Sequence, residues 1–453
     1  MSNLGIYSGK FNYGNTKDEY HGNLQVDKIN NIITLTLTIS TSDLNTVPLF
    51  PLESKINIIY GKLLTGETVM LYDCYVVSES NHKNFTQKSL NYTTQVIRAS
   101  YLFETDIMLG KEGLLVVSAQ VDFGNILEWA DLCHYTWEGD STTWNPVWIE
   151  KEPISVNILD NLGITFIPSR VSGMLDNYQE KFELNQKVYT KFQYAEPVEW
   201  EVFLEDIKKV EHLIGFGIQR KVRFEGIRCQ LFNNDSRYEC YNDEVTLGIG
   251  KIENTDNQHP YFFLYNLETI IEEDHFSKWI YYYGKLQPIL DLYFLMLDNQ
   301  YYLTSETVFL NMVQALETFH ARFITDDVKE YIARSKSLVE SLHDYEGWLS
   351  FLCDDRQQRE RSIYLKSRLA DLMFADGQYL ELDPKYIQKI VDTRNYYTHY
   401  NLKKLGKSFT KSELPIVNYR LKILLEFHIL KLVGFDEINL KKKYFESIRK
   451  LRK

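Results

Sequence analysis

Hydrophobic and polar residues alternate along the first half of the chain with the period of two that is typical of β-strands. Residues 32–40 (IITLTLTIS) place Ile and Leu on one face and Thr and Ser on the other, which predicts a half-buried strand. Residues 56–64 and 68–77 flank a Thr65-Gly66-Glu67 turn, and this arrangement predicts a hairpin. Other segments continue the pattern: strands at 114–123, 219–232 and 237–250, and a helix at 197–214. Antiparallel β structure with inserted helices is therefore expected.

The second half of the chain has the 3.6-residue period of helices. Residues 248–260 are rich in Gly, Asn and Asp and end in Pro, which makes them a linker candidate. Thr304 or Ser305 is a suitable cap for a helix whose apolar stripe extends from Phe309 to Phe323. The other predicted helices begin at Pro288 (to about 297), span 326–342 and 356–375, begin at Asp383-Pro384, and span 412–432.

These patterns predict an α+β protein with two domains, as expected for 453 residues. A β-rich domain is expected at residues 1–255, and an all-α helical bundle at 256–453.

Charge is distributed unevenly along the chain, whose net charge is −12. Residues 1–255 carry −12 and residues 256–384 carry −11, whereas residues 385–453 carry +11. A basic segment after an acidic body has two interpretations. It binds nucleic acid or another polyanion, or its lysines coat the last helices and neutralise the acidic body.

Composition excludes several classes of protein. The five cysteines are far apart and have no C-x-x-C spacing, which argues against a disulfide scaffold and against a structural zinc site. No apolar run approaches the length that crosses a bilayer, and the first ten residues lack the pattern of a secretory signal. We therefore expect a cytoplasmic protein without a membrane partner.

Four of the seven tryptophans fall within residues 129–148. They are suited either to stacking on sugar or nucleobase rings or to packing in the core. The Gly-rich fragments at 215–217 and 248–251 complete no phosphate-binding motif and are read as turns. The first half therefore contains no recognisable catalytic motif.

The helix that begins at Asp383 carries the strongest chemical signal. Its apolar stripe of Ile387, Ile390 and Val391 continues at Arg394, where a guanidinium needs a polar or anionic partner. Asn395 and His399 are four residues apart and share one face. Arg394 and His399 are five apart, about 140° around a regular helix. They serve one site only if the helix ends or widens near Tyr397, if Arg394 reaches around, or if two chains share the site.

Arginine and histidine together are suited to metal-independent RNA cleavage. A histidine can transfer the proton of the 2′-hydroxyl or of the leaving oxygen, and an arginine can stabilise the phosphate charge. The 2′-hydroxyl is then the nucleophile, and the products are a 2′,3′-cyclic phosphate and a 5′-hydroxyl. The lysines that follow are placed to bind the RNA backbone: Lys403, Lys404, Lys407 and Lys411. An arginine that caps the bundle beside a helix-end histidine is the structural alternative.

Arg394-Asn395, three residues and His399, late in a helix of a helical domain, resemble the signature of HEPN ribonucleases. The β-rich first half and the helical second half resemble the ApeA family of bacterial anti-phage proteins. Residues 9–27 and 59–74 are similar to its N-terminal domain, and residues 315–323 are similar to the first core HEPN helix.

The resemblance implies a catalytic pair, Arg394 and His399, with Asn395 as a polar auxiliary and with no metal or cofactor. Glu317 and His320 are three residues apart on the first core helix. They either line the same site or form a surface pair. His428 lies within the last apolar helix and is predicted to be a core histidine.

The resemblance further implies an abortive-infection endoribonuclease that cleaves cellular RNA, with tRNA as one candidate. A homodimer or higher homo-oligomer through the HEPN domain is expected, together with an N-terminal domain that restrains the nuclease or responds to a phage-derived trigger. The alternative is a catalytically inactive HEPN module that binds RNA or a nucleotide.

Overall fold

The protein, described by a computed structural model, divides into two compact units. The N-terminal unit contains residues 1–218 and 222–268, and the C-terminal unit contains residues 219–221 and 269–453. The predicted linker at 248–260 and the predicted boundary after residue 255 lie outside the described residues. The structure describes residues 4–13, 19–41, 55–82, 91–104, 114–124, 126–139, 144–159, 161–169, 172–175, 182–232, 242–247, 263–298, 303–340, 344–353, 357, 360–376, 383–400, 402–440 and 442.

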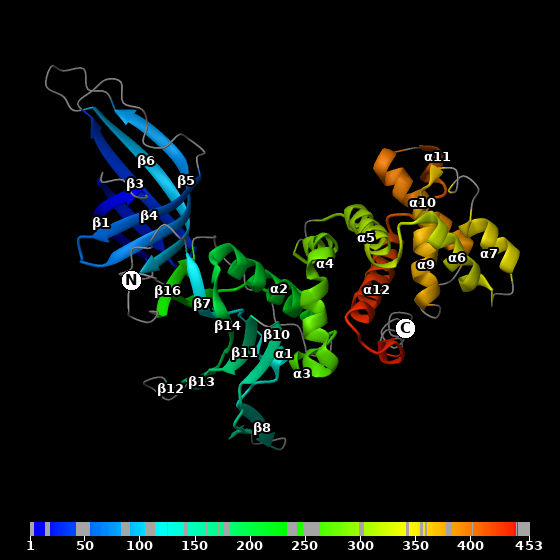
Figure 1. Cartoon of the computed structure of the whole chain (residues 1–453), viewed down its shortest axis with the longest axis horizontal. Helices are drawn as coiled ribbons and strands as arrows, with labels where there is room; N and C mark the ends of the chain where they lie inside the picture. The colour runs from blue at the N-terminus through cyan, green and yellow to red at the C-terminus, as the bar shows by residue number, and fades with distance from the viewer. Residues whose placement is uncertain are drawn as a thin grey trace. The chain divides into compact units, whose positions relative to one another are not determined.

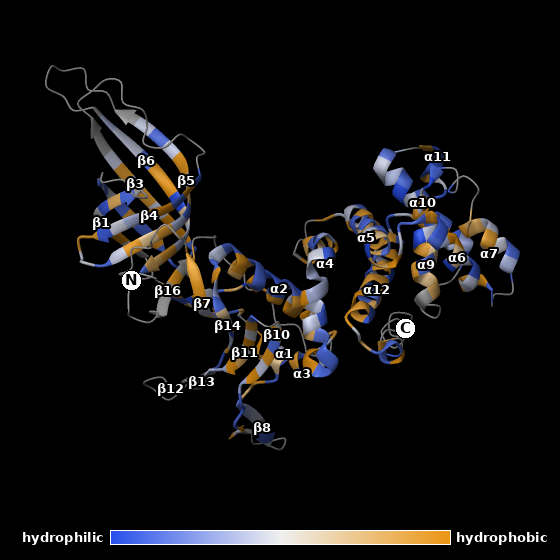
Figure 2. Ribbon diagram, in the orientation of Figure 1, coloured by the Kyte–Doolittle hydropathy of each residue, from blue (hydrophilic) through white to orange (hydrophobic). Residues whose placement is uncertain are grey.

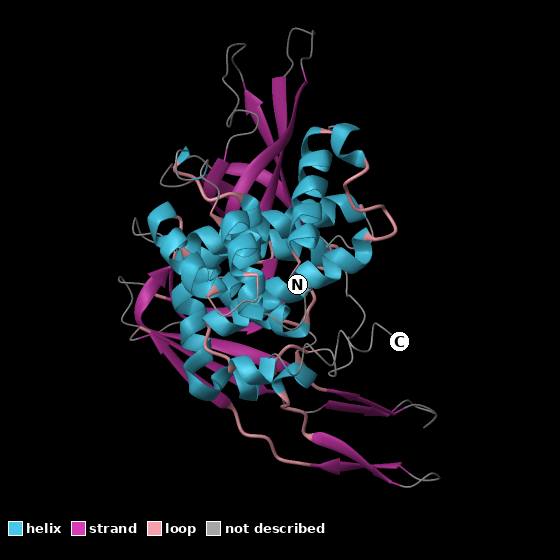
Figure 3. Cartoon of the chain, turned by 90° about the vertical axis from the view of Figure 1, so that its right-hand side faces the viewer, coloured by secondary structure: helices cyan, strands magenta, loops and turns pink. Residues whose placement is uncertain are grey.

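The N-terminal unit is built mainly of strands, which Figure 3 distinguishes from the helices by colour. In chain order its elements are β1 (Leu4–Tyr13), β2 (Tyr20–Asp27), β3 (Ile32–Thr41), β4 (Lys55–Leu63), β5 (Thr68–His82), β6 (Asn91–Glu104), β7 (Leu115–Asp122), α1 (Leu127–Ala130), β8 (Tyr135–Gly139), β9 (Trp144–Trp148), β10 (Ile154–Leu159), β11 (Leu162–Pro168), β12 (Ser172–Leu175), β13 (Phe182–Asn185), β14 (Val188–Glu199), α2 (Trp200–Ile218), β15 (Gly226–Leu231) and β16 (Asn242–Leu247).

Twelve of these strands form one antiparallel sheet in the order β10-β11-β14-β7-β15-β16-β6-β3-β2-β1-β4-β5. β5 also pairs with β6, which closes β1 to β6 into a barrel (Figure 1). Alternate residues of these strands, such as Leu35, Ile59 and Leu71, are buried in the barrel core. The predicted strand at 32–40 and the predicted hairpin are confirmed as β3 and as β4 with β5. Gly66 in that turn has a φ of 107°, a conformation that favours glycine.

The helix predicted at 197–214 is α2 (Trp200–Ile218), which packs against β7 and β14. Its apolar residues recur at helical spacing, and Trp200, Phe203 and Val210 are fully buried. Trp200 contributes to an aromatic cluster, with ring centroids 5.2 Å from those of Tyr101 and Phe103. Aromatic packing of this kind anchors α2 on the sheet.

The C-terminal unit is helical. The helices that the structure describes in this half are α3 (Leu267–Ile271), α4 (His275–Asp298), α5 (Ser305–Phe319), a π-helical turn (His320–Ile324), α6 (Val328–Val339), α7 (Tyr345–Leu352), α9 (Leu365–Asp376), α10 (Pro384–His399), α11 (Leu402–Leu405) and α12 (Leu414–Leu432), with a short 3₁₀ turn (Glu272–Asp274) before α4. The α+β class predicted from the sequence is confirmed.

Two sequence predictions for the helices are wrong. Pro288 does not begin a helix but lies inside α4. The apolar face of α4 is buried on both sides of the proline, at Trp279 and at Tyr293, and this burial compensates for the missing backbone hydrogen bond. The helix predicted at 356–375 is not continuous, because residues 361–364 are not helical and α9 begins at Leu365. The sequence did not predict α7.

The core of the C-terminal unit forms around α5 and α12. α5 packs against α4, α9, α10 and α12. Figure 2 shows hydrophobic residues concentrated along α5 and α12, and Phe309, Leu316 and Leu424 are fully buried there. None of the described helices combines the length and the apolarity needed to cross a membrane.

Candidate functional site

The helix α10, labelled in Figure 1, carries the candidate motif near its C-terminal end. The side chain of Asp383 accepts a hydrogen bond of 2.9 Å from the backbone of Lys385, and Pro384 occupies the first helical position. This is the predicted N-cap followed by proline. Ile387 and Ile390 are buried and anchor the helix. The motif residues therefore stand on a firmly packed element.

Arg394 is half-buried between two polar partners. Its Nη1 donates a 3.3 Å hydrogen bond to Oδ1 of the adjacent Asn395. Its Nη2 lies 4.0 Å from Oε2 of Glu317 on α5, and each of these two side chains is 36% exposed. The arginine thus has a polar and an anionic neighbour, yet it keeps access to solvent.

His399 is exposed in the last turn of α10. The helix remains α-helical through Tyr397 and ends at His399, and Tyr400 follows in the left-handed conformation with a φ of 48°. The helix therefore neither ends early nor widens near Tyr397. This excludes one of the three arrangements that would bring Arg394 and His399 into one site. An arginine that reaches around the helix and a site shared by two chains both stay open.

The four lysines after the motif have different environments. Lys404 forms a 2.6 Å ion pair with Asp392, whose side chain is only 7% exposed. Lys411 forms a 3.0 Å pair with Glu306, and its own side chain is 85% exposed. The hydrogen bond from Lys411 contributes to lowering the pKa of Glu306, after the larger effect of a backbone hydrogen bond. Lys403 and Lys407 are exposed. Exposed pairs such as that of Lys411 contribute little to stability and exchange readily.

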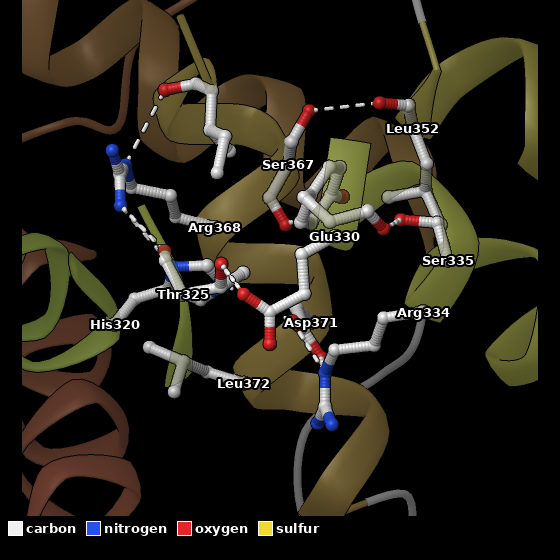
Figure 4. Close-up of polar contacts among 12 residues, drawn as sticks. His320, Thr325, Glu330, Arg334, Ser335, Leu352, Ser367, Arg368, Asp371 and Leu372 are labelled. Carbon is white, nitrogen blue, oxygen red and sulfur yellow. Dashed lines mark hydrogen bonds and ion pairs between the residues drawn. The ribbon is translucent and has the colours of Figure 1, made fainter. Parts of the chain in front are cut away.

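Glu317 and His320 do not occupy one surface. Glu317 faces Arg394, whereas His320 is fully buried. The ring of His320 lies between Asp371, 3.0 Å from its Nε2, and Arg368, 3.2 Å from its Nδ1 (Figure 4). Both the surface-pair alternative and a role in lining the solvent-exposed site are therefore incompatible with the position of His320.

The contacts of His320 determine which of its ring nitrogens carries the hydrogen. A guanidinium can only donate, so Nδ1 accepts from Arg368 and Nε2–H donates to the Asp371 carboxylate. Arg334 donates from Nε to both oxygens of Asp371, at 3.0 and 2.9 Å. Burial alone would raise the pKa of Asp371, but hydrogen bonds from His320 and Arg334 outweigh it and leave that pKa below its ordinary value. The cluster is internally satisfied.

Comparison with protein-family models gives two matches. Residues 6–279 match the model described as ApeA N-terminal domain 1. That match covers more than half of the chain. Residues 310–438 match the model described as Apea-like HEPN.

The chain belongs to the ApeA family.

The HEPN match of this ApeA protein spans α5 to α12 and contains Arg394, Asn395 and His399. The candidate motif thus lies within the matched helical domain. Searches of curated proteins and of solved structures found no match.

The tryptophans of the ApeA N-terminal domain have different environments. Trp129 is fully buried and packs edge-on against Phe166, with ring centroids 5.9 Å apart. Trp148 is 51% exposed and stacks on His134 at 4.5 Å. The side chains of Trp137 and Trp144 lie outside what the structure describes. Packing explains Trp129, and the ring-stacking interpretation stays open for Trp148.

Sequence reasoning missed the partners of His320. Arg368 and Asp371 are three residues apart on α9, among the buried apolar residues Leu369, Ala370, Leu372 and Met373. Opposite charges at this spacing inside an apolar segment are a detectable signal of a buried polar cluster. His428 is a buried core histidine, as predicted. Its Nε2 lies 2.9 Å from the backbone oxygen of Leu372, and burial lowers its pKa to about 4.

Proposed function

We propose that this ApeA protein is a metal-independent endoribonuclease that acts in anti-phage defence by cleaving cellular RNA, with tRNA as one candidate substrate. The observation that carries the proposal is an exposed His399 at the end of α10, next to Asn395 and a half-buried Arg394, within a HEPN domain. HEPN membership supports the reaction class, and the exposure of the motif supports access for RNA.

In this proposal, His399 takes the proton from a ribose 2′-hydroxyl as general base, or protonates the leaving 5′-oxygen as general acid. The 2′-oxygen attacks the phosphorus, a new P–O bond forms, and the P–O5′ bond breaks. Arg394 binds the phosphate and stabilises the charge that develops on it. Asn395 holds Arg394 through their hydrogen bond. The products are a 2′,3′-cyclic phosphate and a 5′-hydroxyl.

A second copy of the chain completes the site in this proposal. Arg394 and His399 project about 140° apart on a helix that stays regular between them. A cleft between two HEPN domains lets the arginine of one copy meet the histidine of the other. The proposed assembly is therefore a homodimer, or a higher homo-oligomer built from such pairs.

Cleavage of total bacterial RNA by the purified full-length protein in EDTA tests the proposal, with His399→Ala in parallel. We expect cyclic-phosphate ends from the wild type and at least a 100-fold slower reaction from the variant. RNA that stays intact with the wild type, while it still binds, would instead favour an inactive module that holds RNA or a nucleotide. The approach of Glu317 to Arg394, which partly neutralises the arginine, is the observation that favours this second candidate.

The N-terminal domain acts as a restraint in this proposal, released by a phage-derived trigger. Residues 1–255 carry a net charge of −12 and are suited to repelling RNA. A folded protein that lacks these residues is expected to cleave RNA faster than the full chain. Equal or slower cleavage would contradict the restraint while leaving the nuclease assignment intact.

A further inference from the structure

A groove of about 730 Å³ runs along the first three turns of α10, on the side covered by residues 406–413. α10 contributes Lys385, Gln388, Lys389 and Asp392, and the covering segment contributes Lys407 and Glu413. Both walls belong to the C-terminal unit. The groove contains three lysines, two carboxylates and several neutral polar side chains from two elements, and charged side chains such as these can bind a charged ligand.

The two carboxylates of the groove are already occupied. Oδ1 of Asp392 accepts hydrogen bonds from Nζ of Lys404 at 2.6 Å and from Nε2 of Gln388 at 3.2 Å. Glu413 receives the backbone N–H of Thr410 at 2.7 Å.

Lys389 adds a 2.9 Å ion pair to Glu413. The backbone hydrogen bond and this lysine lower the pKa of Glu413 to about 2, so it is ionised and held in place. Neither Lys385 nor Lys407 has an ion pair within the part of the chain that the structure describes. Their exposed ammonium groups give the groove its capacity for an anion.

The face of α10 that lines the groove continues, beyond the groove, toward one member of the candidate motif. Positions 385, 388, 389 and 392 recur at spacings of three and four, and the same stripe continues at Asn395 and His399. Arg394, nine residues after Lys385, projects about 180° away from it. A strand that lies in the groove is therefore led along α10 to His399, about 15 Å beyond Lys389 on the helix axis.

We propose that this groove binds the phosphate backbone of the single-stranded RNA that leads to His399. The inference rests on the proposed ribonuclease function and extends it with a binding subsite upstream on α10. Lysine ammonium groups contact phosphate oxygens without reading bases, so the subsite contributes affinity for any RNA sequence.

Binding of a fluorescent single-stranded 2′-O-methyl RNA to the full-length protein tests the proposal, because this RNA lacks the nucleophilic hydroxyl and cannot be cleaved. The double variant Lys385→Gln, Lys407→Gln is expected to bind roughly tenfold more weakly near 0.1 M salt, and to lower the slope of log affinity against log salt by about 1.4. The matched control removes two exposed lysines of α6, Lys329→Gln with Lys336→Gln, and should change neither quantity.

Gly406 offers a second test that leaves the lysines in place. A methyl group at this position meets no atom within 4 Å, and its φ is not in the left-handed region. Gly406→Asp adds a carboxylate to the groove and should weaken RNA binding at least severalfold, while Gly406→Ala should bind as the wild type does. If the double groove variant, the double α6 control, Gly406→Asp and Gly406→Ala all bind RNA with the same affinity, the subsite is overturned.

Two further results separate the explanations. Displacement of the RNA by adenosine monophosphate at equal concentration would show a mononucleotide site and would overturn the backbone assignment. Weaker binding by the groove variants supports the subsite even if the wild type never cleaves RNA, in which case the proposed nuclease alone fails. Normal binding by these variants alongside confirmed cleavage overturns the subsite alone.

Discussion

The C-terminal unit holds arginine, histidine and carboxylate side chains in two opposite surroundings. At the end of α10, His399 is exposed and Arg394 is half-buried, with a carboxylate 4.0 Å away. Between α5, α6 and α9, His320 and Asp371 are buried, and hydrogen bonds of 3.0 and 3.2 Å occupy both ring nitrogens of the histidine. His320 and Asp371 are therefore closed to a ligand from solvent. Residue type alone therefore does not distinguish a candidate reactive site from a structural cluster. Bonding capacity that is unused and in contact with solvent is the feature that differs between the two.

The largest effect is expected from separating the two halves of the exposed motif. Arg394→Ala and His399→Ala should each lower RNA cleavage by about 10²–10⁴-fold, because each removes a group that acts on the reacting phosphate or proton. If two chains share a site, mixing the variants after dissociation should restore about a quarter of wild-type activity, since half of the dimers carry one intact site. Activity that stays at the level of either single variant would place both residues in one chain.

The buried cluster around His320 and Asp371 should respond in stability and not in cleavage. Asp371→Asn removes the charge that His320 and Arg334 share, and should lower the free energy of unfolding by about 3–5 kcal/mol in urea titrations. Asp326→Asn is the matched control, because its carboxylate pairs with Arg368 but is 71% exposed. That variant should lose less than about 1 kcal/mol. Equal losses would contradict the contrast between buried and exposed pairs.

A second buried histidine makes stability depend on pH. The pKa of His428 is lowered to about 4 from an ordinary value of 6.5, mainly by burial. The unfolded chain therefore binds the proton first as pH falls. The contribution of neutral His428 to the free energy of unfolding is fully present above pH 6.5. It is lost progressively as the pH falls toward 4, by about 3 kcal/mol in total. His428→Gln keeps an N–H donor for Leu372 but does not titrate. The difference in free energy of unfolding between the wild type and this variant should therefore narrow as the pH falls from 6.5 to 4.

The smallest effect is expected at Glu317. Its pair with Arg394 is long and half-exposed, and such pairs contribute at most about 1 kcal/mol. Glu317→Gln should free the arginine and lower KM for an RNA oligonucleotide about twofold, with kcat nearly unchanged. A kcat reduced 100-fold would instead give Glu317 a direct part in proton transfer.

Local patterns predicted the elements better than they predicted partners. Alternation identified β3, the turn at Gly66 gave the β4–β5 hairpin, and Asp383 with Pro384 located the start of α10. Pro288 was misread because the buried apolar face on both sides of it overrides the local signal. Barrel closure depends on pairing between distant strands, which no local period contains.

The candidate site shows the same division. Spacing placed Asn395 and His399 on one helix face and located the exposed motif. The spacing could not distinguish the half-exposed Glu317 from the buried His320 three residues later, because the orientation of α5 depends on its packing against α9, α10 and α12. The groove escaped notice because half of its lining comes from residues 406–413, which have no periodic pattern of their own.

β6 is shared by two parts of the twelve-stranded sheet. β5 pairs along nearly its whole length, while on the other side β3 pairs with residues 91–99 and β16 with residues 101–103. Inserting or deleting one residue inside such a strand turns its later side chains to the opposite face. Over evolutionary time, changes of length in this N-terminal unit should therefore accumulate in the connections between strands, and β6 should tolerate substitution while keeping its fourteen positions.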